Sequence, residues 1–237
     1  MNGVLNIFKP KGMSSFDAVR VVKKVAGTGK VGHTGTLDPE ATGVLPICIG
    51  RATKIIDYIM DSEKVYEVTL KLGIRTTTYD LEGEVLEERD PSHLTEEEIL
   101  NSINSFKGEY SQIPPMYSAL KQNGVRLYEL ARKGIEVERK GRLVNIYNLE
   151  DIKINNPYIS MKVTCSKGTY IRSLCYDIGE KLGVFATMTQ LNRAKTSVFS
   201  QEKSININEL TKENINDYIL SMEEALEKYD KIVVNKK

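Results

Sequence analysis

The order of helix and strand patterns along the 237 residues constrains the fold more than any other feature of the sequence. Alternating apolar residues predict strands, whereas apolar residues spaced three and four apart predict helices. The expected strands are residues 4–8, 44–49, 65–72, 144–154 and 159–165. The expected helices are residues 14–26, 52–60, 95–106, 127–133, 170–182 and 215–229. Because the two types do not alternate regularly, we expect an α+β fold with a mixed, largely antiparallel central sheet flanked by helices.

Single residues mark several of the expected helix ends and turns. Thr95 and Glu98 have the spacing of a capping box, which opens a helix. Asn123-Gly124 predicts a tight turn, and Gly183 is a suitable helix terminator. No linker-like segment divides the chain, so we expect one main domain over residues 1–230.

The scarce residue types exclude several kinds of chemistry. The chain has two histidines and three cysteines, too few for a histidine-rich zinc site, and no Cys-x-x-Cys spacing. It has no glycine-rich phosphate-binding motif, so no nucleotide cofactor is expected. Cys48, Cys165 and Cys175 are expected to be ordinary buried thiols in a reducing compartment, which predicts the cytoplasm. An enzyme with this composition is expected to use carboxylates, with neither metal nor cofactor.

Charge is unevenly distributed behind a formal net charge of +1. Residues 80–98 hold nine acids and one base, whereas residues 115–172 hold eleven bases and five acids. The first sixty residues are also basic, with eight bases and four acids. A solvated face explains an acidic run in most proteins, and we expect that here. The two basic segments predict a positive face that attracts phosphates.

Residues 32–47, GHTGTLDPEATGVLPI, form the most unusual stretch of the chain. Its glycines permit tight turns, and Pro39 disfavours a helical conformation at Asp38. A stiff loop that presents one carboxylate is therefore expected between a helix and a strand. From spacing alone, an aspartate that merely caps a turn is the commoner explanation, as in most Asp-Pro pairs.

This stretch resembles the catalytic motif of the TruB family of tRNA pseudouridine synthases. Six further segments with matching order support the resemblance: NIFKPKGMSS at 6–15, GRATK at 50–54, KVYE at 64–67, PPMYSALK at 114–121, CSKGTYIR at 165–172 and QLNRAK at 190–195. The resemblance implies a pseudouridine synthase fold and isomerisation of uridine 55 in the T loop of tRNA. It also implies that the enzyme needs neither a cofactor nor a metal. The implied enzyme is a monomer, and its partner is the T-arm stem-loop of tRNA.

The resemblance assigns the chemistry to two side chains. Asp38 matches the catalytic aspartate, which attacks either the ribose C1′ or the pyrimidine C6; the sequence does not choose between these routes. Arg172 matches the basic partner that keeps this aspartate ionised and oriented.

Four more residues match positions that contact the flipped-out uridine. Tyr66 matches the aromatic residue that stacks on the target base, although a strand tyrosine can also be a core residue. Tyr170 matches a substrate-contacting position, and Leu191 matches an apolar pocket wall or a plain core residue. His33 matches a residue that fills space near the extruded nucleotide, whereas a lone loop histidine is more often solvated.

Basic residues in two places are expected to bind RNA. Lys9 and Lys11 precede the first helix and would contact phosphates near the site, unless they are simply solvated. Residues 114–142 resemble an RNA-gripping insertion, in which Lys121 and Arg132 lie among aromatic and other basic residues. We expect this insertion to order on RNA.

Family members commonly continue into a small C-terminal RNA-binding module. Only a short tail, residues 231–237, follows the expected catalytic domain, so no complete module of that kind is expected. An RNA-binding or tRNA-folding protein with secondary isomerase activity is the alternative interpretation. A glycosidase-like hydrolase is disfavoured, because no second catalytic carboxylate is evident.

Overall fold

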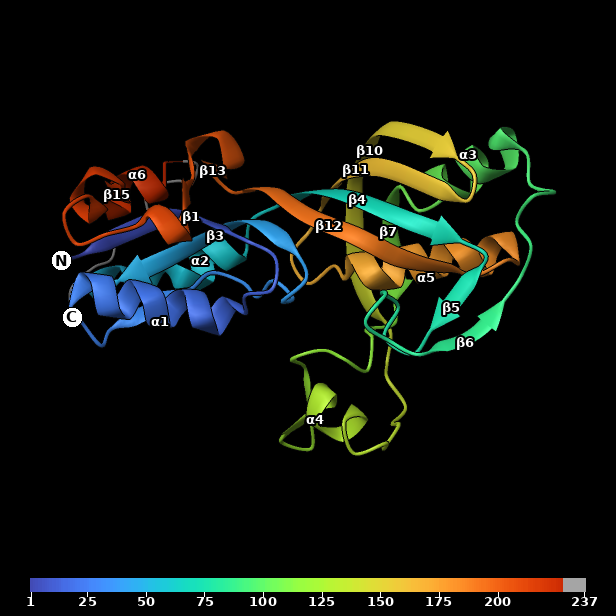
Figure 1. The fold of residues 1–237 in the computed structure, drawn as a ribbon, viewed down its shortest axis with the longest axis horizontal. Helices are drawn as coiled ribbons and strands as arrows, with labels where there is room; N and C mark the ends of the chain where they lie inside the picture. Colours follow the sequence, from blue (N-terminus) through green and yellow to red (C-terminus); the bar gives the residue numbers. More distant parts are fainter. Residues whose placement is uncertain (228–237) are drawn as a thin grey trace. The chain divides into compact units, whose positions relative to one another are not determined.

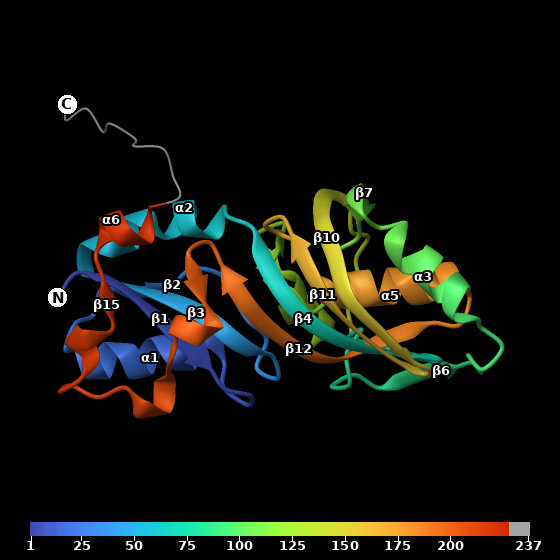
Figure 2. The same cartoon turned by 90° about the horizontal axis from the view of Figure 1, so that it is seen from above.

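The computed structural model describes residues 1–227 (Figures 1 and 2). The chain forms two compact units. The first unit comprises Met1–Tyr66 and the chain from Leu191 onward, and the second comprises Glu67–Gln190. The predicted bounds of a catalytic domain at residues 1–230 remain a prediction, and the predicted tail, residues 231–237, lies outside the described residues.

A mixed sheet forms the centre of the first unit. Strand β1 (Gly3–Lys9) pairs antiparallel with β3 (Thr42–Ile49) along its whole length. The other edge of β3 pairs with the C-terminal part of β12 in parallel and with β2 (Val31–His33) antiparallel. Three short strands complete this unit: β13 (Phe199–Ser200), β14 (Ile205–Asn206) and β15 (Ile219–Leu220). Val4, Leu5, Ile7, Val44 and Ile47 are fully buried, so this strand pair forms the core of the unit.

Helix α1 (Ser15–Ala26) begins at Ser14, which forms a capping box with Asp17. Its buried face contains Ala18, Val19 and Val22. Phe16 does not belong to this face, although its spacing from Val19 and Val22 predicts that it does. Its ring is 60% exposed and lies beneath the Arg20 guanidinium, 5.4 Å from it.

In the second unit, the strands of the same eleven-stranded sheet follow the order β12-β4-β11-β10-β7. Their bounds are β4 (Lys64–Leu72), β7 (Gly108–Gln112), β10 (Arg142–Asn155), β11 (Tyr158–Cys165) and β12 (Ala186–Thr196). Strands β5 (Ile74–Thr76) and β6 (Val85–Glu88) form a separate hairpin. Helices α3 (Glu96–Asn104) and α5 (Ile171–Leu182) pack against each other. The predicted α+β class with a mixed, largely antiparallel sheet is confirmed.

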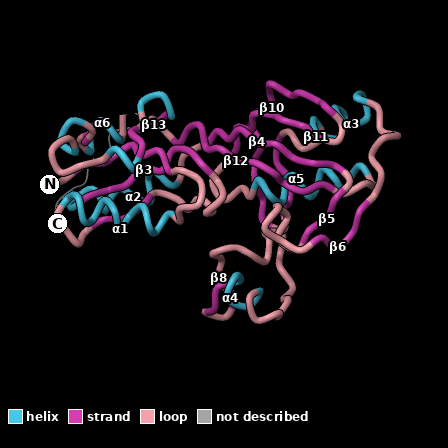
Figure 3. The backbone as a smooth tube through the Cα atoms, viewed as in Figure 1, coloured by secondary structure: helices cyan, strands magenta, loops and turns pink. Residues whose placement is uncertain are grey.

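A segment between β7 and β10 extends away from the strands of the second unit (Figure 3). It contains the hairpin of β8 (Lys121–Gln122) and β9 (Val125–Arg126), followed by α4 (Leu127–Ala131). Asn123 and Gly124 join the hairpin with φ values of 51° and 82°, the geometry that favours Asn-Gly in two-residue turns. The segment corresponds to the insertion predicted at 114–142.

Two helix predictions need correction. Residues 52–60 begin as a 3-10 helix, η1 (Gly50–Ile55), and become α-helical only in α2 (Ile56–Met60). The described part of residues 215–229 is not one helix. It consists of η4 (Ile215–Asp217), β15 and α6 (Met222–Ala225). Pairing of Ile219 and Leu220 with β1 interrupts the helix, and a capping box at Ser221 starts a new one.

Two further 3-10 turns, η2 (Gln201–Lys203) and η3 (Ile207–Glu209), connect the short C-terminal strands. The three cysteines are free and buried, as expected. Among the described residues, no helix has the length and apolar character needed to cross a membrane.

Candidate active site

Asp38 lies in the loop between β2 and β3, and both of its chain neighbours are fixed by hydrogen bonds. The Leu37 N–H donates to the Ser15 hydroxyl at 2.8 Å, and that hydroxyl donates to the Leu37 carbonyl at 2.9 Å. On the other side, the Pro39 carbonyl accepts from the Gly12 N–H at 2.9 Å. The start of α1 and the turn before it therefore hold the half-buried carboxylate in a defined place. This agrees with the predicted stiff loop.

Arg193, on β12, holds the two ends of the same loop together. Its side chain is almost fully buried, with Nε 2.8 Å from the Val44 carbonyl and Nη2 3.1 Å from the Gly35 carbonyl. The backbones approach closely at Gly43, where a Cβ would lie 2.3 Å from the Arg193 carbonyl oxygen at a φ of 112°. Only glycine fits that position, which explains one glycine of the motif. The sequence interpretation did not single out Arg193.

Lys9 is a second buried cation beside this loop. Its ammonium group donates to the carbonyls of Met13 at 2.6 Å, Pro10 at 3.0 Å and Pro39 at 3.1 Å. Burial lowers the pKa of Lys9 to about 8, and the attraction of the Asp38 carboxylate partly opposes this shift. The predicted phosphate contact of Lys9 is wrong, because its side chain is fully buried and its donors are occupied by backbone carbonyls.

His33 is the last residue of β2, and its ring is half-buried. Its Nδ1 accepts a hydrogen bond from the Gly35 N–H at 3.3 Å. Burial and, to a lesser extent, the charge of Arg193 lower the pKa of His33. The imidazole is therefore neutral at pH 7, with its proton on Nε2. This arrangement differs from a solvated loop histidine, and contact with the extruded nucleotide remains a prediction.

Tyr66 and Leu191 lie in the same unit as Asp38, on β4 and β12. Tyr66 is 9% exposed and belongs to the buried row of β4 that continues with Val68 and Leu70. Leu191 is half-buried. Both positions suit a pocket wall as well as a core, so stacking of Tyr66 on uracil and the apolar contact of Leu191 remain predictions.

Arg172 lies in the first turn of α5 in the second unit, and its guanidinium is buried. Nη1 lies 3.4 Å from a carboxylate oxygen of Asp80, in a pair whose side chains are 7% and 11% exposed. Nη1 also donates to the Thr78 carbonyl at 3.2 Å, and Nη2 donates to the Tyr117 carbonyl at 2.8 Å. The structure thus gives Arg172 a carboxylate partner that the sequence interpretation did not name. Its predicted partnership with Asp38, which lies in the other unit, remains a prediction.

Asp80 is the exception within the acidic stretch. Most of residues 81–98 are exposed, as a solvated face requires, but Asp80 is buried. Its second carboxylate oxygen accepts from the Thr78 hydroxyl at 2.5 Å and the Glu82 N–H at 3.0 Å. The acidic composition of the stretch does not distinguish Asp80 from its exposed neighbours. The Thr-x-Asp-x-Glu spacing of an Asx turn was the only sequence signal for its fixed position.

Tyr170 is the N-cap residue of α5, and it is half-buried. Its side chain makes no cap hydrogen bond. Instead, the Tyr170 N–H donates to the side chain of Gln112 at 2.8 Å. The Gln112 side chain therefore fixes the backbone of Tyr170. Contact of the Tyr170 side chain with the substrate remains a prediction.

The predicted RNA-binding residues of the insertion lie at the surface. Lys121 and Arg132 are exposed, and the Arg132 guanidinium lies 5.3 Å from the centre of the Tyr128 ring. Lys11 is exposed too, and its ammonium group pairs with Glu40 at 3.0 Å. An exposed ion pair of this kind contributes little to stability, and the phosphate contact of Lys11 remains a prediction.

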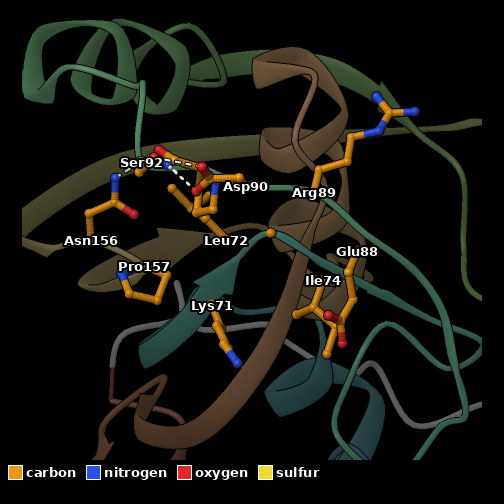
Figure 4. Close-up of a pocket in the computed structure, with 11 residues that line it drawn as sticks. Lys71, Leu72, Ile74, Glu88, Arg89, Asp90, Ser92, Asn156 and Pro157 are labelled. Atoms are coloured by element: carbon orange, nitrogen blue, oxygen red, sulfur yellow. Dashed lines mark hydrogen bonds between the residues drawn. The ribbon is translucent and has the colours of Figure 1, made fainter.

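A cavity of about 480 Å³ opens elsewhere in the second unit (Figure 4). Lys71, Arg89, Asp90, Ser92 and Asn156 are among its lining residues. Asp90 and Ser92 bond to each other, and Asn156 bonds to the Pro91 carbonyl. None of the predicted site residues lines this cavity. Within residues 1–227, no cluster of three or more His, Cys, Asp or Glu side chains is arranged to hold a metal ion.

Comparison with known proteins defines the class. Residues 23–171 match the model described as "TruB family pseudouridylate synthase (N terminal domain)". Residues 172–227 match the "tRNA pseudouridylate synthase B C-terminal domain". Among solved structures, a Cbf5-Nop10-Gar1 complex contains a chain with a TM-score of 0.74 at 30% identity. The match covers 95% of this protein and 61% of that chain. The fold is therefore that of a pseudouridine synthase.

Curated relatives narrow the class to one family. A protein of Clostridium perfringens (strain ATCC 13124), named tRNA pseudouridine synthase B, is 64% identical over 100% of this chain and 81% of its own length. The protein of the same name from Clostridium tetani is 61% identical over 99% of this chain and 81% of its own length. The chain belongs to the TruB family of pseudouridine synthases.

Proposed function

We propose that this protein converts uridine 55 in the T loop of tRNA to pseudouridine, with Asp38 as the nucleophile. One observation carries the proposal: Asp38 is held by hydrogen bonds on both of its flanks, in a chain that matches relatives named tRNA pseudouridine synthase B over its full length. A carboxylate in a fixed loop suits attack on one defined atom, because little reorganisation is needed in the transition state.

The proposed reaction is an isomerisation and conserves all atoms. The N1–C1′ glycosidic bond breaks, the detached uracil turns, and a C5–C1′ bond forms. The proton of C5 passes to solvent and N1 gains one. The Asp38 carboxylate forms a transient bond either to C1′ or to C6, which then breaks to release the product and regenerate the carboxylate.

The other proposed site residues hold the extruded nucleotide or the carboxylate. Arg172 pairs with Asp38, Tyr66 stacks on the uracil, and Tyr170 and Leu191 contact its edges and face. His33 occupies space near the nucleotide, and its neutral ring suits contact with an uncharged base. Stacking and phosphate contacts together offset the few kcal/mol that extrusion of a base costs.

The proposed partner is the T-arm stem-loop, bound by a monomeric enzyme. The exposed cations of the insertion, with Lys121 and Arg132 among them, support an RNA surface. The free, buried thiols of Cys48, Cys165 and Cys175 support a reducing compartment, which for a tRNA enzyme is the cytoplasm.

The test is tritium release from a T-arm transcript labelled at C5 of uridine. Asp38→Asn keeps the size of the side chain and removes the nucleophile, so release should stop while RNA affinity persists. Asp57→Asn is the matched control, because Asp57 is exposed on α2 of the same unit. Near-normal release by Asp38→Asn refutes the catalytic assignment. Release from a transcript with cytidine at position 55 refutes the choice of nucleotide.

The same experiment addresses a function in RNA folding. A tRNA-folding protein with secondary isomerase activity would keep its main function in Asp38→Asn, because the substitution leaves the exposed cations of the insertion in place. Loss of RNA binding together with turnover would instead show that Asp38 supports the fold of its loop.

A further inference from the structure

The start of helix α5 is joined to the segment that follows β7 by a series of hydrogen bonds. The Ser173 hydroxyl donates to the Ile113 carbonyl at 2.8 Å, and Arg172 donates to the Tyr117 carbonyl at 2.8 Å. Gln112, the last residue of β7, bonds to Tyr170 immediately before these two. All of these residues lie within the second unit. The base of the insertion therefore runs along the first turn of α5.

Gln112 makes the most specific of these contacts. Its side-chain Oε1 accepts from the Tyr170 N–H at 2.8 Å, and its Nε2 donates to the Tyr170 carbonyl at 3.1 Å. The amide thus satisfies both backbone groups of one residue, as a neighbouring strand would. Since the Tyr170 side chain does not cap the helix, the Gln112 amide fixes the backbone where α5 begins.

The Tyr170 backbone sets the orientation of this amide. Its N–H can only donate and its carbonyl can only accept, so Oε1 must face the N–H and Nε2 must face the carbonyl, which rules out the flipped arrangement. In this orientation Gln112 Nε2 also donates to the Tyr110 hydroxyl at 2.5 Å. Gln112 is 1% exposed, so water does not replace these bonds.

We propose that Gln112 is a positioning residue of the isomerisation. It acts through the start of α5, where it fixes Tyr170 and, two residues later, the aim of the Arg172 guanidinium. This inference rests on the proposed roles of Tyr170 and Arg172 at the uridine. The hydrogen bonds of Gln112 do not reach RNA, so it contributes to the rate and not to RNA affinity.

The test measures single-turnover tritium release and T-arm affinity for Gln112→Met. Methionine has a similar volume and makes none of the three hydrogen bonds. We expect the rate to fall between about 10-fold and about 100-fold, because small displacements of a catalytic group have effects of that order. The dissociation constant for T-arm RNA should change less than about twofold, since the exposed cations that bind phosphate are untouched.

Thr187→Val is the matched structural control. Thr187 is fully buried in the same unit, and its hydroxyl donates one hydrogen bond to the Ile74 carbonyl at 3.0 Å. The variant should lose stability and keep the wild-type rate. If Thr187→Val slows turnover as much as Gln112→Met at an equal loss of stability, the effect of Gln112 is only structural and the proposal is overturned.

A second variant keeps the test decisive if Gln112→Met does not fold. Gln112→Glu retains the acceptor for the Tyr170 N–H and lacks the two donors, so its rate should also fall at unchanged affinity. A wild-type rate in any folded Gln112 variant overturns the inference alone. An inactive wild-type protein with intact RNA affinity would instead overturn the proposed function.

Discussion

Removal of Asp80 should destabilise the second unit, because the buried Arg172 guanidinium then loses the Asp80 carboxylate. The two side chains are 11% and 7% exposed and lie 3.4 Å apart. Breaking a buried pair by removing one partner costs about 3–5 kcal/mol. For a protein of this size, that loss corresponds to a fall of roughly 6–20 °C in the midpoint of thermal unfolding. We therefore expect Asp80→Ala to be among the most damaging single substitutions outside the core.

Two variants separate the charge from the hydrogen bonds of Asp80. Asp80→Asn keeps an oxygen that can accept from the Thr78 hydroxyl and the Glu82 N–H. The difference in unfolding free energy between Asp80→Asn and Asp80→Ala therefore gives the contribution of these two hydrogen bonds. Urea unfolding of both variants gives the free energies, and Glu88→Ala, at an exposed acid, should stay within about 0.5 kcal/mol of wild type. A loss below about 1 kcal/mol in Asp80→Ala would refute the idea of a desolvated pair.

Three further expectations concern a titrating carboxylate, a close backbone contact and the RNA surface. Burial and a neighbouring carboxylate raise the pKa of Asp177 to about 7, so the stability it contributes is present below pH 4 and is lost as the pH rises through 7. The melting temperature of Asp177→Asn should therefore exceed that of wild type at pH 8 and equal it at pH 4. The same difference in melting temperature at both pH values would contradict this expectation. Gly43→Ala should prevent folding or cost about 3 kcal/mol or more, whereas Gly29→Ala, in open space, should be near neutral by thermal unfolding. Lys121→Glu and Arg132→Glu should each weaken T-arm binding and reduce the slope of log affinity against log salt by about 1; unchanged affinity would exclude the insertion as the RNA surface.

Sequence periodicity predicts much of the fold, because several elements bury one face in a simple pattern. The buried row of β4 is predictable in this way, and the capping box at Thr95 and Glu98 predicts the start of α3. Strand β12 was missed. Its central residues, from Thr189 to Asn192, are half-buried or exposed, and Arg193 and Thr196 are buried polar residues. A strand that buries polar side chains among backbone carbonyls has no apolar alternation to detect.

The site residues that were missed share one physical feature. Asp80, Gln112 and Arg193 are buried polar residues whose partners are distant in sequence or are backbone atoms. The Arg193 guanidinium, for example, reaches carbonyls 149 and 158 residues away. Composition and spacing report neither burial nor these partners. Lys9 was misassigned for the same reason, because a lysine in a basic segment looks solvated until its surroundings are known.

Lys9 and Arg193 also suggest why the aspartate loop can be rigid before RNA arrives. A buried cation is unfavourable unless hydrogen bonds replace its hydration, and here five hydrogen bonds to backbone carbonyls do so. Loosening the loop would remove the Pro39 bond of Lys9 and the Gly35 bond of Arg193, which would leave both buried charges with fewer partners. The cost of displacing the loop therefore exceeds that of displacing a loop held by neutral hydrogen bonds. RNA binding energy then need not order the segment that carries Asp38, and more of it remains for extruding the uridine.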